Sequence, residues 1–182
     1  MTICVYGASR NGISAAHIAA GEELGRKMAE RGHRLVFGGG ASGMMGAAAR
    51  GMHRGGGYII GVAPTFFNVD GVLYPECNEM IGTETMRERK RTLEDSSDAF
   101  IVTPGGIGTY DEFFEVLTLK HLNRHAKPIA VFNNNGYFDP LLKMIEQNVA
   151  EGFINPGVCS LYFVGNTADE VLDYIESAVA ER

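Results

Sequence analysis

Short apolar runs alternate with helical stretches along the whole chain. The apolar runs lie at residues 3–6, 35–37, 58–63, 99–102 and 128–132, with a weaker last run at 162–164. Helical periodicity predicts helices over residues 14–30, 44–53, 84–94, 110–123, 138–151 and 167–180. Strands that alternate with helices are typical of βαβ units and a parallel sheet. The sequence therefore predicts the α/β class, as a single doubly wound, Rossmann-like parallel sheet with helices on both faces.

Two helix ends carry recognisable signals, and one segment carries none. Gly32 follows the first helix where a left-handed cap belongs. Thr167, with Glu170 three residues later, predicts a capping box at the last helix. The segment 64–83 has no clear period and is expected to be irregular.

Length and charge limit the classes of protein to consider. A chain of 182 residues fits one domain over 1–182, and 45% hydrophobic with 21% charged residues is ordinary for a globular protein. The net charge of −6 argues against nucleic-acid binding, which needs a basic face. Its three cysteines form no CxxC pair. With no signal peptide or membrane-spanning run expected, a cytoplasmic location is predicted.

Three of the predicted strands end in glycine-rich turns, at 7–12, 38–43 and 105–109. Glycine lets backbone N–H groups approach a ligand closely, and the helix that follows adds a partial positive charge. Together they predict a phosphate site at the carboxyl ends of the strands. None of the turns matches a Walker A or complete GxGxxG pattern, so NAD binding and ATP hydrolysis have little support. The alternative is that these segments are only tight turns.

Glu112 and Glu115 share a predicted helix face with the apolar Val116 and Leu119. Carboxylates on an apolar face cost free energy unless they are paired or functional. Thr109 and Glu112 also fit a capping box, which is the structural alternative. The nearby turn at 105–109 favours a functional role for Glu112.

The helix at 84–94 repeats this arrangement with positive charges. Arg89 and Lys90 share its inward stripe with Met86 and Leu93, whereas Arg87 and Arg91 are among the residues expected to stay solvated. Arginine suits an anion or a planar ligand. An acid, a base and a phosphate site together suggest bond cleavage on a phosphorylated sugar, because carboxylates stabilise an oxocarbenium-like state or activate water.

Three motifs stand out along the chain: Gly38-Gly-Gly-Ala-Ser-Gly43-Met-Met-Gly46, Met86-Arg-Glu-Arg89-Lys90 and Pro104-Gly-Gly-Ile-Gly-Thr-Tyr-Asp-Glu112. Together they resemble the LOG family of cytokinin riboside 5′-monophosphate phosphoribohydrolases. The resemblance extends from Cys4 to about Ile154. It implies hydrolysis of the N-glycosidic bond of N6-modified adenosine 5′-monophosphates, and of AMP, to free base and ribose 5-phosphate. It also implies a homodimer or larger homo-oligomer whose sites borrow residues across the subunit interface.

The resemblance also implies roles for single residues. Arg89 and Glu112 match the family's catalytic pair. The turn that binds the 5′-phosphate is matched by Gly105, Gly106, Gly108 and Thr109. Other positions near the nucleotide are matched by Ser9, Met86, Lys90, Glu115 and Thr118. Departures from the family pattern include Arg87 in place of histidine and Asp111 where glutamate is common, which bear on base specificity and dimer contacts.

No cofactor and no metal are expected. The five histidines show no metal-ligand spacing. Some relatives carry the label lysine decarboxylase, but no lysine here lies in a recognisable Schiff-base site for pyridoxal phosphate. The alternative function is a non-hydrolytic carrier of a nucleotide or a molybdopterin-type cofactor, and a third is a dimerising scaffold with a vestigial motif. A carrier would not need both Arg89 and Glu112.

Overall fold

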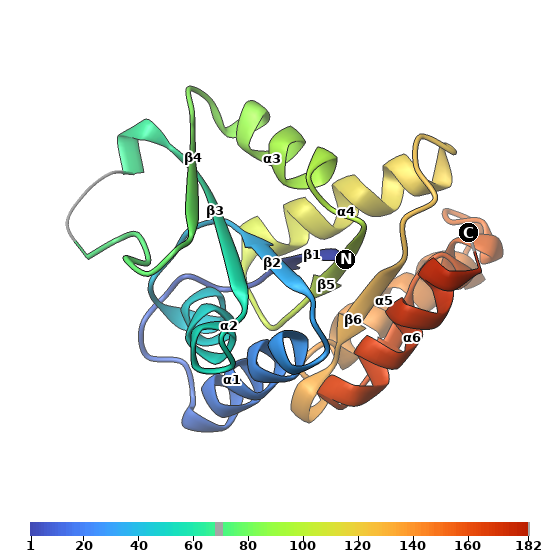
Figure 1. Cartoon of the computed structure of the whole chain (residues 1–182). Coiled ribbons are helices and arrows are strands. Elements are labelled where there is room, and N and C mark those ends of the chain that lie inside the picture. Colours follow the sequence, from blue (N-terminus) through green and yellow to red (C-terminus); the bar gives the residue numbers. More distant parts are fainter. Residues whose placement is uncertain (68–70, 182) are drawn as a thin grey trace.

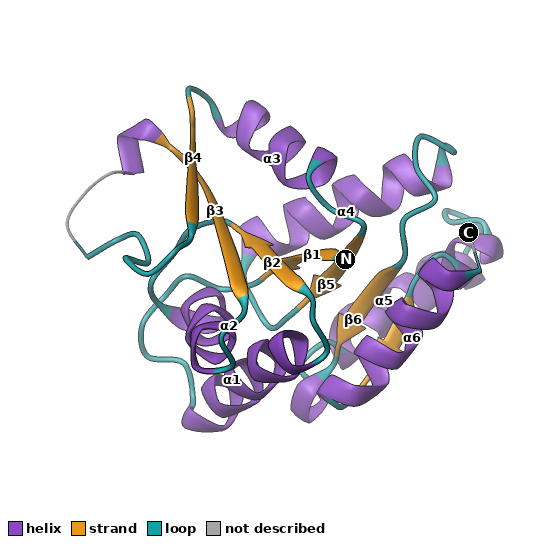
Figure 2. Cartoon of the chain, viewed as in Figure 1, coloured by secondary structure: helices purple, strands orange, loops and turns teal. Residues whose placement is uncertain are grey.

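A parallel sheet flanked by helices forms the protein in a computed structural model that describes residues 1–67 and 71–181 (Figures 1 and 2). The strands are β1 (Thr2–Tyr6), β2 (Arg34–Phe37), β3 (Tyr58–Pro64), β4 (Glu79–Thr83), β5 (Ala99–Val102), β6 (Ile129–Phe132) and β7 (Phe163–Gly165). The helices are α1 (Ala15–Glu30), α2 (Gly43–Arg54), α3 (Met86–Asp95), α4 (Ile107–His121), α5 (Asp139–Ala150) and α6 (Ala168–Ala180). Short 3-10 turns lie at Thr65–Phe67, Asn134–Gly136 and Pro156–Ser160.

Strand order places β1 at the centre of the sheet. The order is β4-β3-β2-β1-β5-β6-β7, and every pair of neighbouring strands is parallel. In the register, Ile3 pairs with Leu35 on one side and with Ala99 on the other. The chain moves outward from β1 to β4 and then returns to β5 at the other side of β1. This switch point opens a crevice at the carboxyl ends of β1 and β5, and the predicted fold class is confirmed.

The apolar strands are buried on both faces, as a parallel sheet requires. Ile3 and Val5 pack in a cluster with residues of α1, α2 and α6, whereas Cys4 and Tyr6 pack with residues of α3, α4 and α5. Figure 1 shows α1 and α2 on one side of the sheet and α3 and α4 on the other. The same alternation brings α3 and α4 together beside the crevice.

One predicted region was wrong. The segment 64–83 was expected to be irregular, but β4 lies within it and pairs with β3. The signal was weak because β4 is an edge strand whose residues are mostly exposed, with only Thr83 buried. Such a strand has no continuous apolar run to mark it.

Helix α4 begins three residues earlier than predicted, and this changes the meaning of its first turn. Gly106 is the N-cap, with no side-chain cap, so Thr109 lies inside the helix and the Thr109–Glu112 capping box is wrong. The predicted left-handed Gly32 is confirmed at φ 74°. Thr167 caps α6 by accepting a hydrogen bond from the N–H of Glu170 at 3.2 Å, while Glu170 itself accepts from the N–H of Asn166.

Candidate active site

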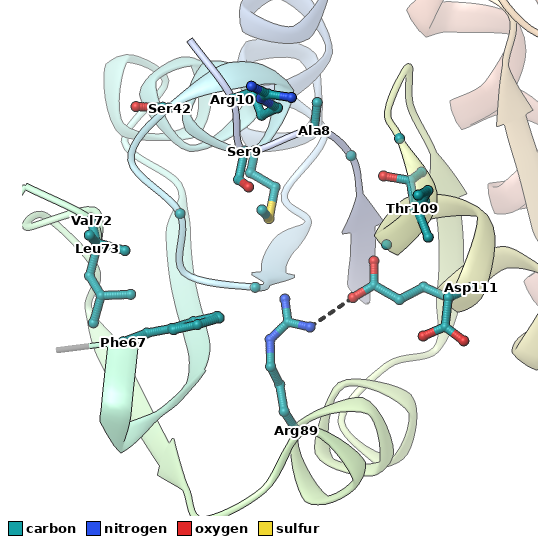
Figure 3. A pocket seen from close by; sticks show the side chains of 18 of the residues that line it. Ala8, Ser9, Arg10, Ser42, Phe67, Val72, Leu73, Arg89, Thr109 and Asp111 are labelled. Atoms are coloured by element: carbon teal, nitrogen blue, oxygen red, sulfur yellow. Dashed lines mark hydrogen bonds and ion pairs between the residues drawn. The ribbon is translucent and has the colours of Figure 1, made fainter. Parts of the chain in front are cut away.

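A cavity of about 590 Å³ opens where β1, β2 and β5 end. Its walls come from the turn after each of these strands and from the N-terminal parts of α3 and α4. Open α/β sheets bind their ligands in this position. Figure 3 shows Ser9 and Arg10 on one side of the cavity, Thr109 and Asp111 on another, and Arg89 between them. The three predicted glycine turns therefore meet at one site.

The turn after β5 leads directly into α4. The first hydrogen bond of this helix runs from the N–H of Tyr110 to the carbonyl of Gly106, at 3.0 Å. The N–H groups of residues 106–109 precede that bond and have no partner within the helix. They also carry the positive end of the helix dipole. Because Gly106, Gly108 and Thr109 line the cavity, an anion there would meet these donors.

A tyrosine supports this turn from behind. The hydroxyl of Tyr137 donates a hydrogen bond to the carbonyl of Gly105 at 2.7 Å, and Gly105 itself is buried. A trans peptide is planar, so a carbonyl fixed toward Tyr137 directs the next N–H, that of Gly106, to the opposite side. Tyr137 thereby sets the orientation of one donor of the turn.

The buried ion pair of Arg89 and Glu112 forms one wall of the cavity. Nη1 of Arg89 lies 2.8 Å from Oε1 of Glu112, and both residues are buried. Nε of Arg89 also donates to the carbonyl of Val62 at 3.2 Å. Arg89 comes from α3 and Glu112 from α4, so two helices on the same face of the sheet bring opposite charges together. Figure 3 draws this contact as a dashed line.

Gly38 makes room for the guanidinium. A Cβ atom at this position would lie 1.9 Å from Nη2 of Arg89. Only glycine therefore fits at the end of β2 while Arg89 keeps its place. The glycine turn after β2 thus contributes to the geometry of the ion pair.

Burial raises the pKa of the Glu112 carboxyl above its ordinary value, and the neighbouring Arg89 opposes part of that rise. A carboxylate with a raised pKa is a better proton acceptor once it is ionised. Glu112 is thus a carboxylate held in place by a cation with little water around it.

Lys90 follows Arg89 on α3 and pairs with two further carboxylates. Its Nζ atom lies 3.1 Å from Asp111 and 3.0 Å from Glu115. Burial opposes the charged form of Lys90, but the hydrogen bonds to Glu115 and Asp111 outweigh it, and its pKa is raised. A Schiff base requires a neutral amine, and a raised pKa disfavours that form.

The structure brings together most of the residues expected at the site. The cavity is lined by Ser9, Met86, Arg89, Lys90, Gly106, Gly108, Thr109 and Glu112. Gly105 lies buried at the base of the turn. Glu115 is connected to the site by its ion pair with Lys90. Thr118 lies elsewhere, in a separate groove on α4 that is lined with Phe114 and Leu117.

Several lining residues were not expected from the sequence. Arg10 and Ser42 belong to turns that had been identified as ligand-binding candidates, so their position in the chain was an available signal. Phe67, Val72 and Leu73 come from the segment without periodicity, and tertiary structure alone brings them here. Figure 3 shows these three apolar side chains across the cavity from Thr109 and Asp111. The cavity thus has a polar side and an apolar side.

Within residues 1–67 and 71–181, no three histidine, cysteine or acidic side chains gather as a metal site would require. None of the helices described there is long and apolar enough to cross a membrane.

The fold defines a Rossmann-like α/β protein with its cavity at the switch point of the sheet. Solved structures share this fold. The molybdenum cofactor carrier protein of Chlamydomonas reinhardtii matches with a TM-score of 0.75 at 22% identity, covering 100% of this chain and 98% of that one. The molybdenum cofactor binding protein of Rippkaea orientalis matches with a TM-score of 0.72 at 18% identity, covering 98% and 95%.

Proteins related in sequence identify the family more narrowly than the solved structures do. The family model described as "possible lysine decarboxylase" matches residues 45–175. The cytokinin riboside 5′-monophosphate phosphoribohydrolase LOG of Oryza sativa subsp. japonica is 38% identical over 179 residues, covering 98% of this chain and 74% of that protein. LOG2 of Arabidopsis thaliana, described with the same activity, is 33% identical, covering 99% and 84%. The chain belongs to the LOG family.

Proposed function

We propose that the protein hydrolyses the N-glycosidic bond of adenosine 5′-monophosphates, including N6-modified cytokinin riboside 5′-monophosphates and AMP. The products are the free base and ribose 5-phosphate. The observation that carries this proposal is the buried Arg89–Glu112 pair beside the glycine turn that opens α4. The activity named for the relatives in rice and Arabidopsis supports it.

The cavity offers a separate place for each part of such a substrate. The N–H groups at the start of α4 suit the 5′-phosphate. The apolar side formed by Phe67, Val72 and Leu73 suits the planar base and an N6 substituent. Glu112 lines the cavity about one helical turn after Thr109, so the ribose and its glycosidic bond would lie next to the phosphate and beside Glu112.

Glu112 supplies the charge that the reaction needs. Glycosidic cleavage passes through an oxocarbenium-like state, in which the sugar carries positive charge, and a nearby carboxylate stabilises that charge. The same carboxylate can orient or deprotonate the attacking water. Arg89 holds Glu112 in one position, so the carboxylate needs no rearrangement during the reaction.

A non-hydrolytic nucleotide carrier would use the same phosphate turn. It would have no need for a carboxylate and a guanidinium buried against each other, and the desolvation cost of burying such a pair can exceed the gain from their attraction. The likeness to the molybdenum cofactor proteins lies in the fold and leaves the Arg89–Glu112 pair unexplained.

The test is a product assay with purified protein. AMP and isopentenyladenosine 5′-monophosphate are incubated separately, and the products are separated by chromatography. We expect free base and ribose 5-phosphate in equal amounts, and the ratio of the two rates measures base preference. Nucleotide that binds but stays intact would contradict hydrolysis of these substrates and favour the carrier.

We further propose a homodimer or larger homo-oligomer with shared sites. Thr118 and Phe114 lie in an apolar groove away from the cavity of their own chain, so Thr118 would reach a nucleotide only across a subunit contact. Light scattering after size exclusion measures the mass directly. A monomer at the concentrations where the enzyme is active would contradict this proposal.

A further inference from the structure

One arginine at the cavity has no carboxylate partner among the described residues. Of those residues, three cations line the cavity: Arg10, Arg89 and Lys90. Arg89 is paired with Glu112, and Lys90 is paired with Asp111 and Glu115. Among residues 1–67 and 71–181, no carboxylate lies within ion-pair distance of Arg10. Arg10 is therefore the one of these three cations that no carboxylate in the described part of the chain contacts.

The backbone next to Arg10 is fixed between two helix starts. Ala8 donates its N–H to the carbonyl of Pro104 at 3.1 Å, and its own carbonyl accepts from the N–H of Met45, also at 3.1 Å. The first contact ties the turn to the loop before α4, and the second ties it to α2. Ala8 therefore links the two glycine turns, and Arg10 follows two residues later.

A glycine in α2 allows this close approach. A Cβ atom on Gly43 would lie 2.4 Å from the carbonyl oxygen of Ala8 and 3.0 Å from the nitrogen of Arg10. Gly43 also has a φ of 64°, which disfavours any other residue. The base of the Arg10 side chain is thus fixed, while its guanidinium remains exposed to solvent at the cavity. This combination suits a group that closes onto an incoming anion.

We propose that Arg10 pairs with the phosphate of the substrate and makes the site selective for a dianionic phosphate monoester. The inference rests on the proposed function and names the residue that neutralises the substrate's charge. The N–H groups at the start of α4 contribute only partial charges. A guanidinium adds a full charge and a planar fork that fits two phosphate oxygens. The charges of Arg89 and Lys90 are already neutralised by carboxylate partners, whereas the charge of Arg10 is not.

The experiment compares Arg10→Gln and Arg10→Lys with Arg124→Gln, which removes the same charge from an exposed position outside the cavity. With AMP, we expect Arg10→Gln to raise KM about tenfold while kcat stays within about twofold. Arg10→Lys should recover part of the loss, because lysine keeps the charge without the fork. The difference in KM between Arg10→Gln and wild type should become smaller as the salt concentration rises, because salt screens the charge of Arg10.

A binding measurement separates this inference from the proposed function. Calorimetric titration with ribose 5-phosphate reports phosphate recognition without hydrolysis, and adenine is the matched phosphate-free probe. Arg10→Gln should weaken ribose 5-phosphate binding about tenfold and leave adenine binding unchanged. If the wild-type protein cleaves no nucleotide, the proposed function fails and this titration alone decides the role of Arg10. Equal affinities for Arg10→Gln and Arg124→Gln, or no ribose 5-phosphate binding by the wild-type protein, would overturn the inference.

Discussion

The ion pair at the cavity and the ion pairs between α1 and α6 differ in burial and in position. Arg89 and Glu112 lie at the cavity, with 7% and 11% of their side chains exposed. Arg31 and Asp169 lie at the contact between the end of α1 and the start of α6, with 25% and 49% exposed. Lys27 also pairs with Asp169 there. Both contacts use the same chemistry, yet only one of them excludes water.

This difference in burial indicates which ion pair has a role other than stability. Exposed pairs contribute little to stability and tolerate change. A buried pair has lost its hydration, and an apolar pair of the same size would often be as stable or more so. The Arg89–Glu112 pair is therefore poorly explained by stability, whereas the Arg31 contacts are explained as docking of α6 onto α1.

The largest expected effect comes from breaking the buried pair. Arg89→Met leaves Glu112 buried without its cation, and we expect the free energy of unfolding to fall by about 3–5 kcal/mol, with activity lost. Arg31→Met, the exposed control, should cost about 1 kcal/mol or less. Urea unfolding followed by circular dichroism measures both changes.

A double variant sharpens this comparison. Arg89→Met combined with Glu112→Leu replaces the pair by apolar groups and should recover most of the lost stability while remaining inactive. If the single variant costs no more than Arg31→Met, or if the double variant recovers activity, the distinction between the two groups of ion pairs is wrong.

The next effect acts on geometry rather than charge. Gly38→Ala would place a Cβ atom 1.9 Å from Nη2 of Arg89 and must displace the guanidinium. A misplacement of this order should lower kcat about a hundredfold. Gly82→Ala is the matched control, because its Cβ would meet only Thr65, at 3.5 Å. Similar kcat values for the two variants would show that the position of Arg89 is unimportant.

The pH dependence of turnover follows from the pKa of Glu112. Activity requires the ionised carboxylate, and burial raises the pKa of Glu112 above the ordinary glutamate value of about 4.3. The acid limb of kcat/KM, which reports the free enzyme, should therefore lie at a higher pH than that value, and activity should fall as the pH drops through the limb. A stopped assay across pH 4–8, at substrate concentrations well below KM, measures the limb. A limb at or below the ordinary value would contradict the direction assigned to Glu112.

The smallest effect is expected at the exposed contacts. Hydrogen bonds from Lys27 and Arg31 lower the pKa of Asp169. This stabilising contribution is present above the unfolded-state pKa and is lost as the pH falls through the lower folded-state value. Asp169→Asn should slightly lower Tm at neutral pH, lose that difference in strong acid and leave kcat unchanged. A change in kcat would show that these contacts reach the site.

Much of the fold could be predicted because buried parallel strands leave a clear signal in the sequence. Runs such as Ala99–Val102 are continuously apolar, and helices with clear periodicity separate them. The strand β4 could not be found this way, since an edge strand needs no apolar run. The start of α4 was predicted three residues too late because its N-cap, Gly106, has no side chain that signals a helix start.

The site was predictable where spacing on a helix reveals it. Arg89 and Glu112 stood out because each is a charge on an otherwise inward-facing stripe. The apolar side of the cavity was not predictable, because Phe67 and Leu73 gain their meaning only from their neighbours in space. Arg10 looked like an ordinary turn residue until the pairing of Arg89 and Lys90 left it as a cation without a described partner.

We propose that Glu112 promotes cleavage of the glycosidic bond that the rest of the cavity positions. The most direct test measures AMP binding and adenine release side by side for the wild-type protein and Glu112→Gln. Glutamine keeps the size and one oxygen acceptor for Arg89 but not the charge. For Glu112→Gln we expect an AMP affinity within a few-fold of wild type and adenine release slower by about a thousandfold. Adenine release at the wild-type rate by a correctly folded Glu112→Gln protein would contradict the proposal.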